Sequence, residues 1–247
     1  MSLPINPYGL TAALRDLVSP QERAFLISHM RANTSLLGHI LNSHPQVDGS
    51  YELQNSYDGR LSLLRQTYLY FSGEGTLRRK RYLFDKLLHN SLSLSPQIAR
   101  RAKILVMARE PIATVESIVR LFSRDEDHPF SKPDSALGYY ERRLAEIIRI
   151  SERIKQRCLY VDSDQLRETP DVVLARLSDY LDLGESLRPE YTLNKHTGKR
   201  GKGDSSSNIF SGKILGREKK IPQRFASLDY ARAEALFQEL QAQLGGQ

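Results

Sequence analysis

The segment from Ala24 to Leu41, AFLISHMRANTSLLGHIL, constrains the fold more than any other part of the chain. An apolar run, Phe25 to Ile27, breaks into the mostly polar or small residues Ser28 to Asn33, and from Thr34 apolar residues return at helical spacing, beginning with Leu36. Strand, tight loop and helix in this order form the geometry of a phosphate-binding loop, in which helix N–H groups face an anion. The loop contains no glycine and no Gly-Lys-Ser/Thr, so it is not a Walker A sequence.

The rest of the chain alternates in the same way between apolar runs and amphipathic segments. AKILVMAR (102–109) and CLYVDS (158–163) are typical of strands buried on both faces, and RYLFDKLLHN predicts a strand ending near Asp85. Helices are predicted at 34–41, 61–69, 110–122, about 136–155, 170–181 and about 228–244. The alternation predicts an α/β fold with three layers, α/β/α, around a mostly parallel sheet, as in P-loop proteins. We expect a single domain over residues 1–247, in which Thr169 caps the 170–181 helix.

The charge of the chain predicts an anionic partner. Its formal net charge is +7 and its pI is about 9.5, which fits a nucleotide, a nucleic acid or an acidic lipid. Cys158 is the one cysteine, so internal disulfides are excluded. No apolar run approaches the roughly 20 residues that cross a bilayer, and the first ten residues lack a signal-peptide pattern. We therefore expect a cytoplasmic protein with no membrane span.

Two strand-to-helix junctions place an arginine where parallel sheets bind ligands, at the carboxyl ends of their strands. Arg31 follows the first strand, and Thr34 and Ser35 open the next helix with hydroxyl and backbone donors. Arg109 follows the apolar residues Ile104–Ala108, and Ser117 lies two helical turns further on. A helix-start Thr-Ser pair is often a plain cap and a strand-end arginine is often a surface residue, but together they predict two anion sites along one sheet edge.

Four segments in this order resemble sulfotransferases. SHMRANTSLLGHILNSHPQV is similar to the 5′-phosphosulfate-binding loop of that family, and VMAREPIATVESIVRLF is similar to its 3′-phosphate-binding segment. YVDSDQLRETPDVVLARLSDYLDL resembles the strand and capped helix that follow, and KRGKGDSSSNIFSG resembles the basic glycine loop that closes over the nucleotide, here at about 195–212. The set spans nearly the whole chain.

The resemblance implies the donor 3′-phosphoadenosine 5′-phosphosulfate (PAPS), no metal, and transfer of a sulfuryl group to an acceptor hydroxyl or amine. Arg31 would face the bridging and leaving oxygens of PAPS. The donor-binding residues that the resemblance implies are Arg31, Ala32, Asn33, Thr34 and Ser35 for the 5′ end, and Arg109 and Ser117 for the 3′-phosphate, helped by Lys199, Arg200 or Lys202.

Two residues are candidates for the general base. Glu52 lies where the tyrosylprotein branch of the family carries a catalytic glutamate, and we favour it over His89, which lies near the histidine base of the small-molecule enzymes. Lys86 matches a family lysine that approaches the sulfonate. The chain departs from the family pattern at Met30 and at Asn33, where proline and glycine are common.

Three other functions compete with this interpretation. A kinase-like nucleotide-binding enzyme on the same fold would need the Lys-Ser/Thr that the loop lacks. A non-catalytic basic module that binds nucleotide or nucleic acid is suggested by charge alone, and we expect no nucleic-acid partner because no recognition motif is present. A degenerate sulfotransferase would bind PAPS without chemistry. The acceptor stays open among small molecules, carbohydrates, lipids and peptides, and the sequence does not indicate an oligomeric state.

Overall fold

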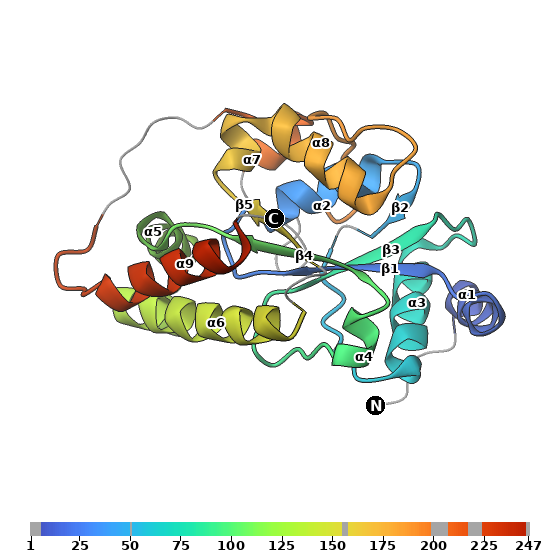
Figure 1. Ribbon diagram of the computed structural model, residues 1–247, viewed down its shortest axis with the longest axis horizontal. Coiled ribbons are helices and arrows are strands. Elements are labelled where there is room, and N and C mark those ends of the chain that lie inside the picture. The colour runs from blue at the N-terminus through green and yellow to red at the C-terminus, as the bar shows by residue number, and fades with distance from the viewer. Residues whose placement is uncertain (1–5, 50, 155–157, 199–206, 217–223, 246–247) are drawn as a thin grey trace.

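The computed structural model describes residues 6–49, 51–154, 158–198, 207–216 and 224–245. Within these ranges the chain forms a parallel sheet with the strand order β2-β3-β1-β4-β5 (Figure 1). The strands are β1 (Glu22–Ile27), β2 (Val47–Asp48), β3 (Tyr82–Leu87), β4 (Lys103–Ala108) and β5 (Cys158–Asp162). Every described pair of neighbouring strands is parallel, which confirms the predicted α/β class.

Helices cover both faces of this sheet. In Figure 1, α2 (Thr34–Ser43), α7 (Gln165–Glu168) and α8 (Pro170–Leu181) lie above it, whereas α3 (Arg60–Glu74), α6 (Pro133–Ile154) and α9 (Ala231–Leu244) lie below. The other described helices are α1 (Pro7–Val18), α4 (Pro96–Ala99), α5 (Pro111–Phe122) and the short 3-10 turns η1 (Pro129–Ser131) and η3 (Ser207–Ser211). None of the helices in the described part of the chain has both the length and the apolar character needed to cross a bilayer.

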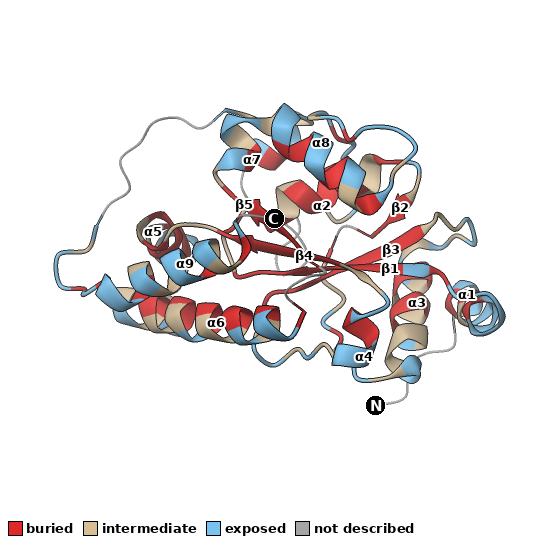
Figure 2. Ribbon diagram, viewed as in Figure 1, coloured by how far each residue is buried: buried red, intermediate tan, exposed pale blue. Residues whose placement is uncertain are grey.

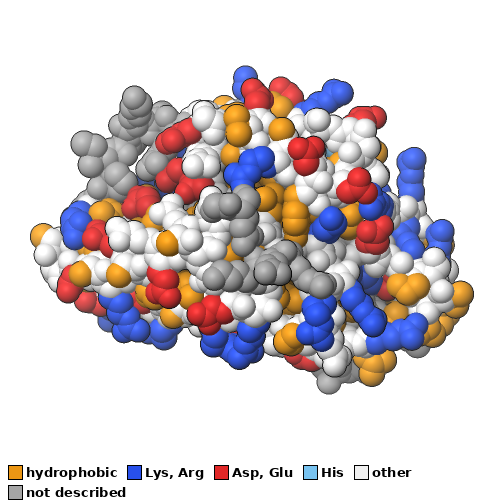
Figure 3. All heavy atoms as spheres, viewed as in Figure 1, with side chains coloured by type: hydrophobic (Ala, Val, Ile, Leu, Met, Phe, Trp, Pro, Cys, Tyr) orange, Lys and Arg blue, Asp and Glu red, His pale blue; other side chains and the backbone are white. Residues whose placement is uncertain are grey.

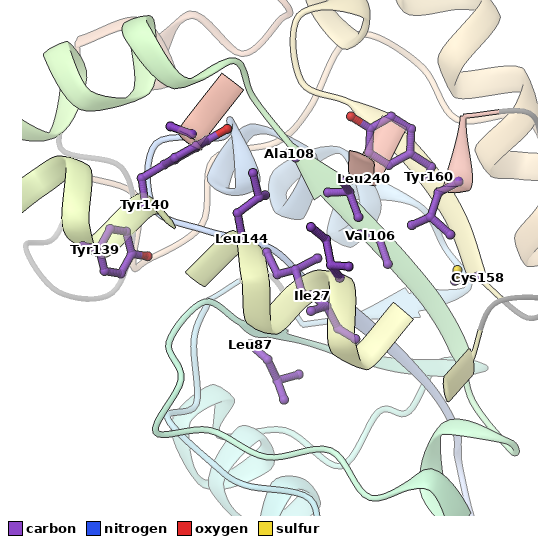
Figure 4. Packing of buried hydrophobic residues seen from close by; sticks show 14 of the residues in the cluster. Ile27, Leu87, Val106, Ala108, Tyr139, Tyr140, Leu144, Cys158, Tyr160 and Leu240 are labelled. Carbon is purple, nitrogen blue, oxygen red and sulfur yellow. The ribbon is translucent and has the colours of Figure 1, made fainter. Parts of the chain in front are cut away.

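The core is divided by the sheet into two layers (Figure 2). Side chains of β1 alternate between them: Leu26 packs with α2 and α8, and Ile27 packs with α6 and α9. Figure 4 shows the lower layer, where Leu144 and Leu240 lie against Ile27 and Val106 of the central strands. Each such fully buried side chain contributes about 1.5–3 kcal/mol. This rigid double layer fixes the carboxyl ends of the strands, where the predicted site lies.

The structure departs from the sequence-based expectations at short elements. β2, α1 and α7 were not predicted, and β3 runs to Leu87 instead of ending near Asp85. Thr169 occupies the position before α8, but its side chain caps nothing there. Because α7 ends immediately upstream, the Thr169 hydroxyl donates back to the carbonyl of Gln165 at 3.3 Å. Thr169 therefore occupies the predicted cap position, but the predicted capping hydrogen bond is wrong.

Candidate functional site

The loop between β1 and α2 holds two non-glycine residues in the left-handed backbone region. The φ angle is 66° at Arg31 and 58° at Asn33, a conformation that costs side-chain-bearing residues roughly 1 kcal/mol or more. Asn33 is held there by its side-chain amide, which donates to Oγ (2.8 Å) and the backbone carbonyl (3.2 Å) of Ser163, the residue after β5. The Asn33 side chain thus ties the loop to a second strand end.

The two predicted anion sites meet in one cluster. Arg31 Nε donates to Ser117 Oγ at 2.9 Å, and Arg109 Nη1 donates to the carbonyl of Arg31 at 3.4 Å. On its other side Arg109 Nε lies 3.5 Å from Oδ1 of Asp164. The structure therefore places the residue predicted for the sulfuryl end of the donor in contact with both residues predicted for its 3′-phosphate.

A pocket of about 180 Å³ opens over this cluster. Its lining combines cations with amide, hydroxyl and apolar groups: Arg31, Asn33, Leu36, Arg109, Ser117, Arg120, Arg167, Tyr191, Asn208, Ile209, Lys213 and Leu215. Ala32 and Thr34 are buried next to it, and Ser35 is partly exposed. Five of the lining residues are cationic and α2 begins at the pocket edge, so the site is suited to a polyanionic ligand.

Three polar side chains of α6 tie the strand ends together beneath the site. Tyr139 Oη accepts the N–H of Met30 and donates to the carbonyl of Leu88, at 3.0 and 3.1 Å. The hydroxyl of Tyr140 donates to the carbonyl of Arg109 at 2.9 Å, and Figure 4 shows both tyrosines on α6 beside Ala108 and Leu144. The helix thus braces the loops after β1, β3 and β4.

Arg143 is the third of these side chains and is 1% exposed. Its Nε donates to the carbonyl of Ser28 at 2.8 Å, and its Nη2 donates to the carbonyl of Leu87 at 2.5 Å. Burial lowers the pKa of Arg143 to about 10, so it stays charged at neutral pH. These contacts of Arg143 were not predicted from the sequence. The run Tyr-Tyr-Glu-Arg-Arg inside an amphipathic helix was the available sign that polar groups lie on its buried face.

His29 links the two arginine junctions through the backbone. Its Nδ1 lies 2.8 Å from the carbonyl of Met30, and its Nε2 accepts the N–H of Arg109 at 3.1 Å. These partners require a neutral ring protonated on Nδ1. Complete burial, together with the positive charges of Arg143 and Arg109, lowers the pKa of His29 to about 4, so the ring is neutral at physiological pH.

The predicted acceptor-side residues gather at the end of β3. Lys86 Nζ lies 3.7 Å from Oε1 of Glu52, and the Lys86 side chain is buried. Gln54 Nε2 donates to the other carboxylate oxygen of Glu52 at 3.0 Å. His89 is half-buried, and burial lowers its pKa against the opposing effect of the Glu52 carboxylate. Glu52 and Lys86 therefore form a pair. Because β3 is paired with β1, this pair lies next to the loop between β1 and α2.

Only the two ends of the predicted closing loop are described. Lys199, Arg200 and Lys202 lie outside the described residues. Before them, Thr197 Oγ1 lies 2.8 Å from Nε2 of His39 on α2, and Lys195 Nζ lies 3.5 Å from Glu74 on α3. The segment that enters the loop thus contacts both α2 and α3.

Comparison with solved structures identifies the fold. The sulfotransferase domain from the Synechococcus PCC 7002 olefin synthase superposes with a TM-score of 0.56 at 17% identity, covering 89% of this chain and 94% of that one. The sulfotransferase domain from the curacin biosynthetic pathway gives a TM-score of 0.52 at 16% identity, covering 90% of this chain and 98% of that one. No family model matches the sequence, and no curated protein sequence is significantly similar to it. The chain has the fold of these sulfotransferase domains.

Proposed function

We propose that this chain is a sulfotransferase that moves a sulfuryl group from PAPS to an acceptor hydroxyl or amine and releases adenosine 3′,5′-bisphosphate. The observation that carries the proposal is the contact of Arg31 with Ser117 and Arg109 in one cationic pocket. A donor with phosphates at both its 3′ and 5′ positions needs two anion sites within one nucleotide length, and a cationic pocket that begins at the start of α2 supports such a donor. In this proposal the chain forms one sulfotransferase domain.

In the proposed complex, Arg109 and Ser117 hold the 3′-phosphate. Asp164 beside Arg109 fixes the guanidinium without neutralising the pocket, because four other cations line it. The 5′-phosphosulfate lies against the loop of Ala32 and Asn33 and the amino-terminal end of α2, where the first helix amides lack partners within the helix. Preorganised N–H donors stabilise the charge that grows on the leaving phosphate.

The reaction is an in-line displacement at sulfur. The acceptor oxygen forms the new S–O bond as the bond from sulfur to the bridging oxygen breaks, and the electron pair leaves with the 5′-phosphate. Glu52 takes the acceptor proton, and Lys86, 3.7 Å from it, faces the sulfonate. Glu52 is favoured over His89 as base because the pair it forms with Lys86 brings a proton acceptor and a cation to the same point.

Calorimetric titration with adenosine 3′,5′-bisphosphate tests the donor site, with AMP and Mg-ATP as competitors of different charge. We expect micromolar binding that requires the 3′-phosphate and is lost in Arg109→Ala. Arg149→Ala is the matched control, since Arg149 pairs with Glu146 on the exposed side of α6. Equal binding of Mg-ATP would favour the kinase-like alternative. Absence of nucleotide binding, together with a salt-dependent complex with bulk DNA, would favour the basic binding module.

On the face that Figure 3 presents, acidic side chains lie among the lysines and arginines. A duplex-binding surface instead concentrates cations in one stripe or patch. This distribution supports a small polyanionic ligand in a pocket over an extended nucleic acid.

A further inference from the structure

The carboxylate of Asp85 bonds to the backbone of Lys86 and to that of Leu53, the residue that follows Glu52. Asp85 lies inside β3 and is 0% exposed. Its Oδ1 accepts two backbone N–H groups, that of Leu53 at 3.1 Å and that of Lys86 at 2.8 Å. Leu53 directly follows Glu52 in the chain, so a single oxygen atom holds the backbone beside the proposed base and the backbone of the proposed sulfonate-facing lysine.

The second oxygen of Asp85 fixes the orientation of the first. Tyr57 Oη donates to Oδ2 at 2.5 Å. Tyr57 itself is 0% exposed, its ring lies 4.5 Å from that of Phe25 on β1, and its backbone N–H and carbonyl bond to Ser93 and Ser95. Both oxygens of Asp85 are thus hydrogen-bonded, with Oδ1 directed at the two amides and Oδ2 at Tyr57.

We infer that Asp85 is a positioning residue, which sets the separation between the Glu52 carboxylate and the Lys86 ammonium by holding both backbones on one oxygen. The inference rests on the proposed function, because it gives Asp85 a task in placing those two groups. It also explains a buried acid at a position where an apolar strand residue would pack: the register of β1 and β3 places Asp85 beside Phe25, in an otherwise apolar environment.

The bonding pattern survives a change of protonation at Asp85. Burial raises its pKa to about 7, and Tyr57, Tyr51 and Lys86 are the titratable groups that face it. A proton added to Oδ2 reverses the bond to Tyr57 and leaves Oδ1 as an acceptor for both amides. Asparagine reproduces that state, with its carbonyl oxygen at Oδ1 and its amide directed at the Tyr57 oxygen. Leucine has a similar volume and provides no acceptor.

Matched variants separate positioning from packing. We expect Asp85→Leu to lower kcat by about ten- to a hundredfold, the size of effect that a displacement near 1 Å produces. Its dissociation constant for adenosine 3′,5′-bisphosphate should stay within twofold of wild type, because the donor pocket contains no part of this cluster. Asp85→Asn should keep kcat within threefold, and Tyr57→Phe, which leaves Oδ1 bonded, should do the same. Wild-type kcat in Asp85→Leu, or equal losses in the leucine and asparagine variants, would overturn the inference.

Amide hydrogen exchange gives a second measurement that does not depend on turnover or on the folding of Asp85→Leu. The Leu53 amide should be protected in wild type and in Asp85→Asn without any ligand, although it belongs to an irregular segment. Exchange at the rate of an unprotected peptide would overturn the inference. Failure of the proposed function has a different signature, since wild type would then bind no adenosine 3′,5′-bisphosphate while the Leu53 amide stayed protected.

Discussion

Nε of Arg31 donates a hydrogen bond to Oγ of Ser117 across 2.9 Å, joining segments that lie 86 residues apart. One residue follows β1 and the other lies on the buried face of α5. Arg109 also donates to the Arg31 carbonyl, so two hydrogen bonds join the segments that carry the two predicted anion sites.

Replacing Ser117 by alanine should weaken binding of adenosine 3′,5′-bisphosphate about tenfold. The variant removes a hydroxyl from the pocket and releases Arg31, and a hydrogen bond to a charged group contributes about 1.5–3 kcal/mol. Calorimetry is the measurement, and AMP binding should change by less than twofold. Ser123→Ala, at the exposed carboxyl end of the same helix, is the control. Parallel losses for AMP and the bisphosphate would contradict a role at the 3′-phosphate.

Substitutions at Asn33 should separate backbone strain from the lost link to β5. Asn33→Ala keeps the strain of φ 58° and loses both bonds to Ser163, so unfolding free energy should fall by about 2 kcal/mol. Asn33→Gly loses the bonds and relieves the strain, so it should cost about 1 kcal/mol less than alanine. Urea denaturation measures both. Equal stability of the two variants would show that the left-handed conformation is not retained.

His29 should make the protein less stable in mild acid. Its folded pKa of about 4 lies below the unfolded value of about 6.5, so the unfolded chain binds more protons between these pH values. The stability that a neutral His29 provides is complete above pH 6.5 and is lost as pH falls toward 4, by on the order of 3 kcal/mol.

The check is the unfolding free energy at pH 7 and pH 4.5 in wild type and in His29→Gln, whose amide retains one donor and one acceptor. The variant should lose less stability than wild type on acidification. The contribution of Asp85 to the pH dependence of stability has the opposite sign. Because its pKa is raised in the folded state, Asp85 stabilises the fold as pH falls from 7 toward 4. An Asp85→Asn background removes that contribution and isolates His29. An unchanged pH slope in the His29 variant would refute the assignment.

Lys80 should support the fold without affecting the site. Its ammonium donates to the carbonyls of Asn42, His44 and Val47 at 2.8, 3.0 and 2.9 Å, where α2 ends and β2 begins. Lys80→Met leaves these carbonyls without their donor and should cost about 2 kcal/mol in thermal or urea unfolding. Arg78→Met, at a neighbouring exposed position, should cost little. A loss of nucleotide affinity equal to that of Arg109→Ala would count against this separation of roles.

The sequence predicted the sheet because β1, β4 and β5 are apolar runs, which strands covered on both faces require. It missed β2 because a two-residue strand has no periodicity to detect. It missed α1 although Leu10, Leu14 and Leu17 recur at helical spacing. All three are exposed, so the apolar face of that helix does not mark its buried side.

Within the candidate site, the predicted alternation of strands and helices was enough to place Arg31 and Arg109 at one edge of the sheet. Their direct contacts depend on rotamers and on φ angles that no spacing pattern encodes. Arg143 and Asp85 were missed for another reason: charged residues in strands and helices are normally assigned to solvent, and only the packed structure reveals that both are buried and bonded.

The strand order affects how the chain is made. β1 lies at the centre, yet both of its neighbours, β3 and β4, are synthesised after it. A nascent β1 therefore has two open edges until Leu87 has emerged and one until Ala108 has emerged, and Asn33 gains its partner only with Ser163. Open edges favour aggregation and long-range pairing slows folding. The loop between β1 and α2 is translated early and acquires its native shape late, so a chain arrested before β5 carries the proposed anion-binding residues without the geometry of the folded site.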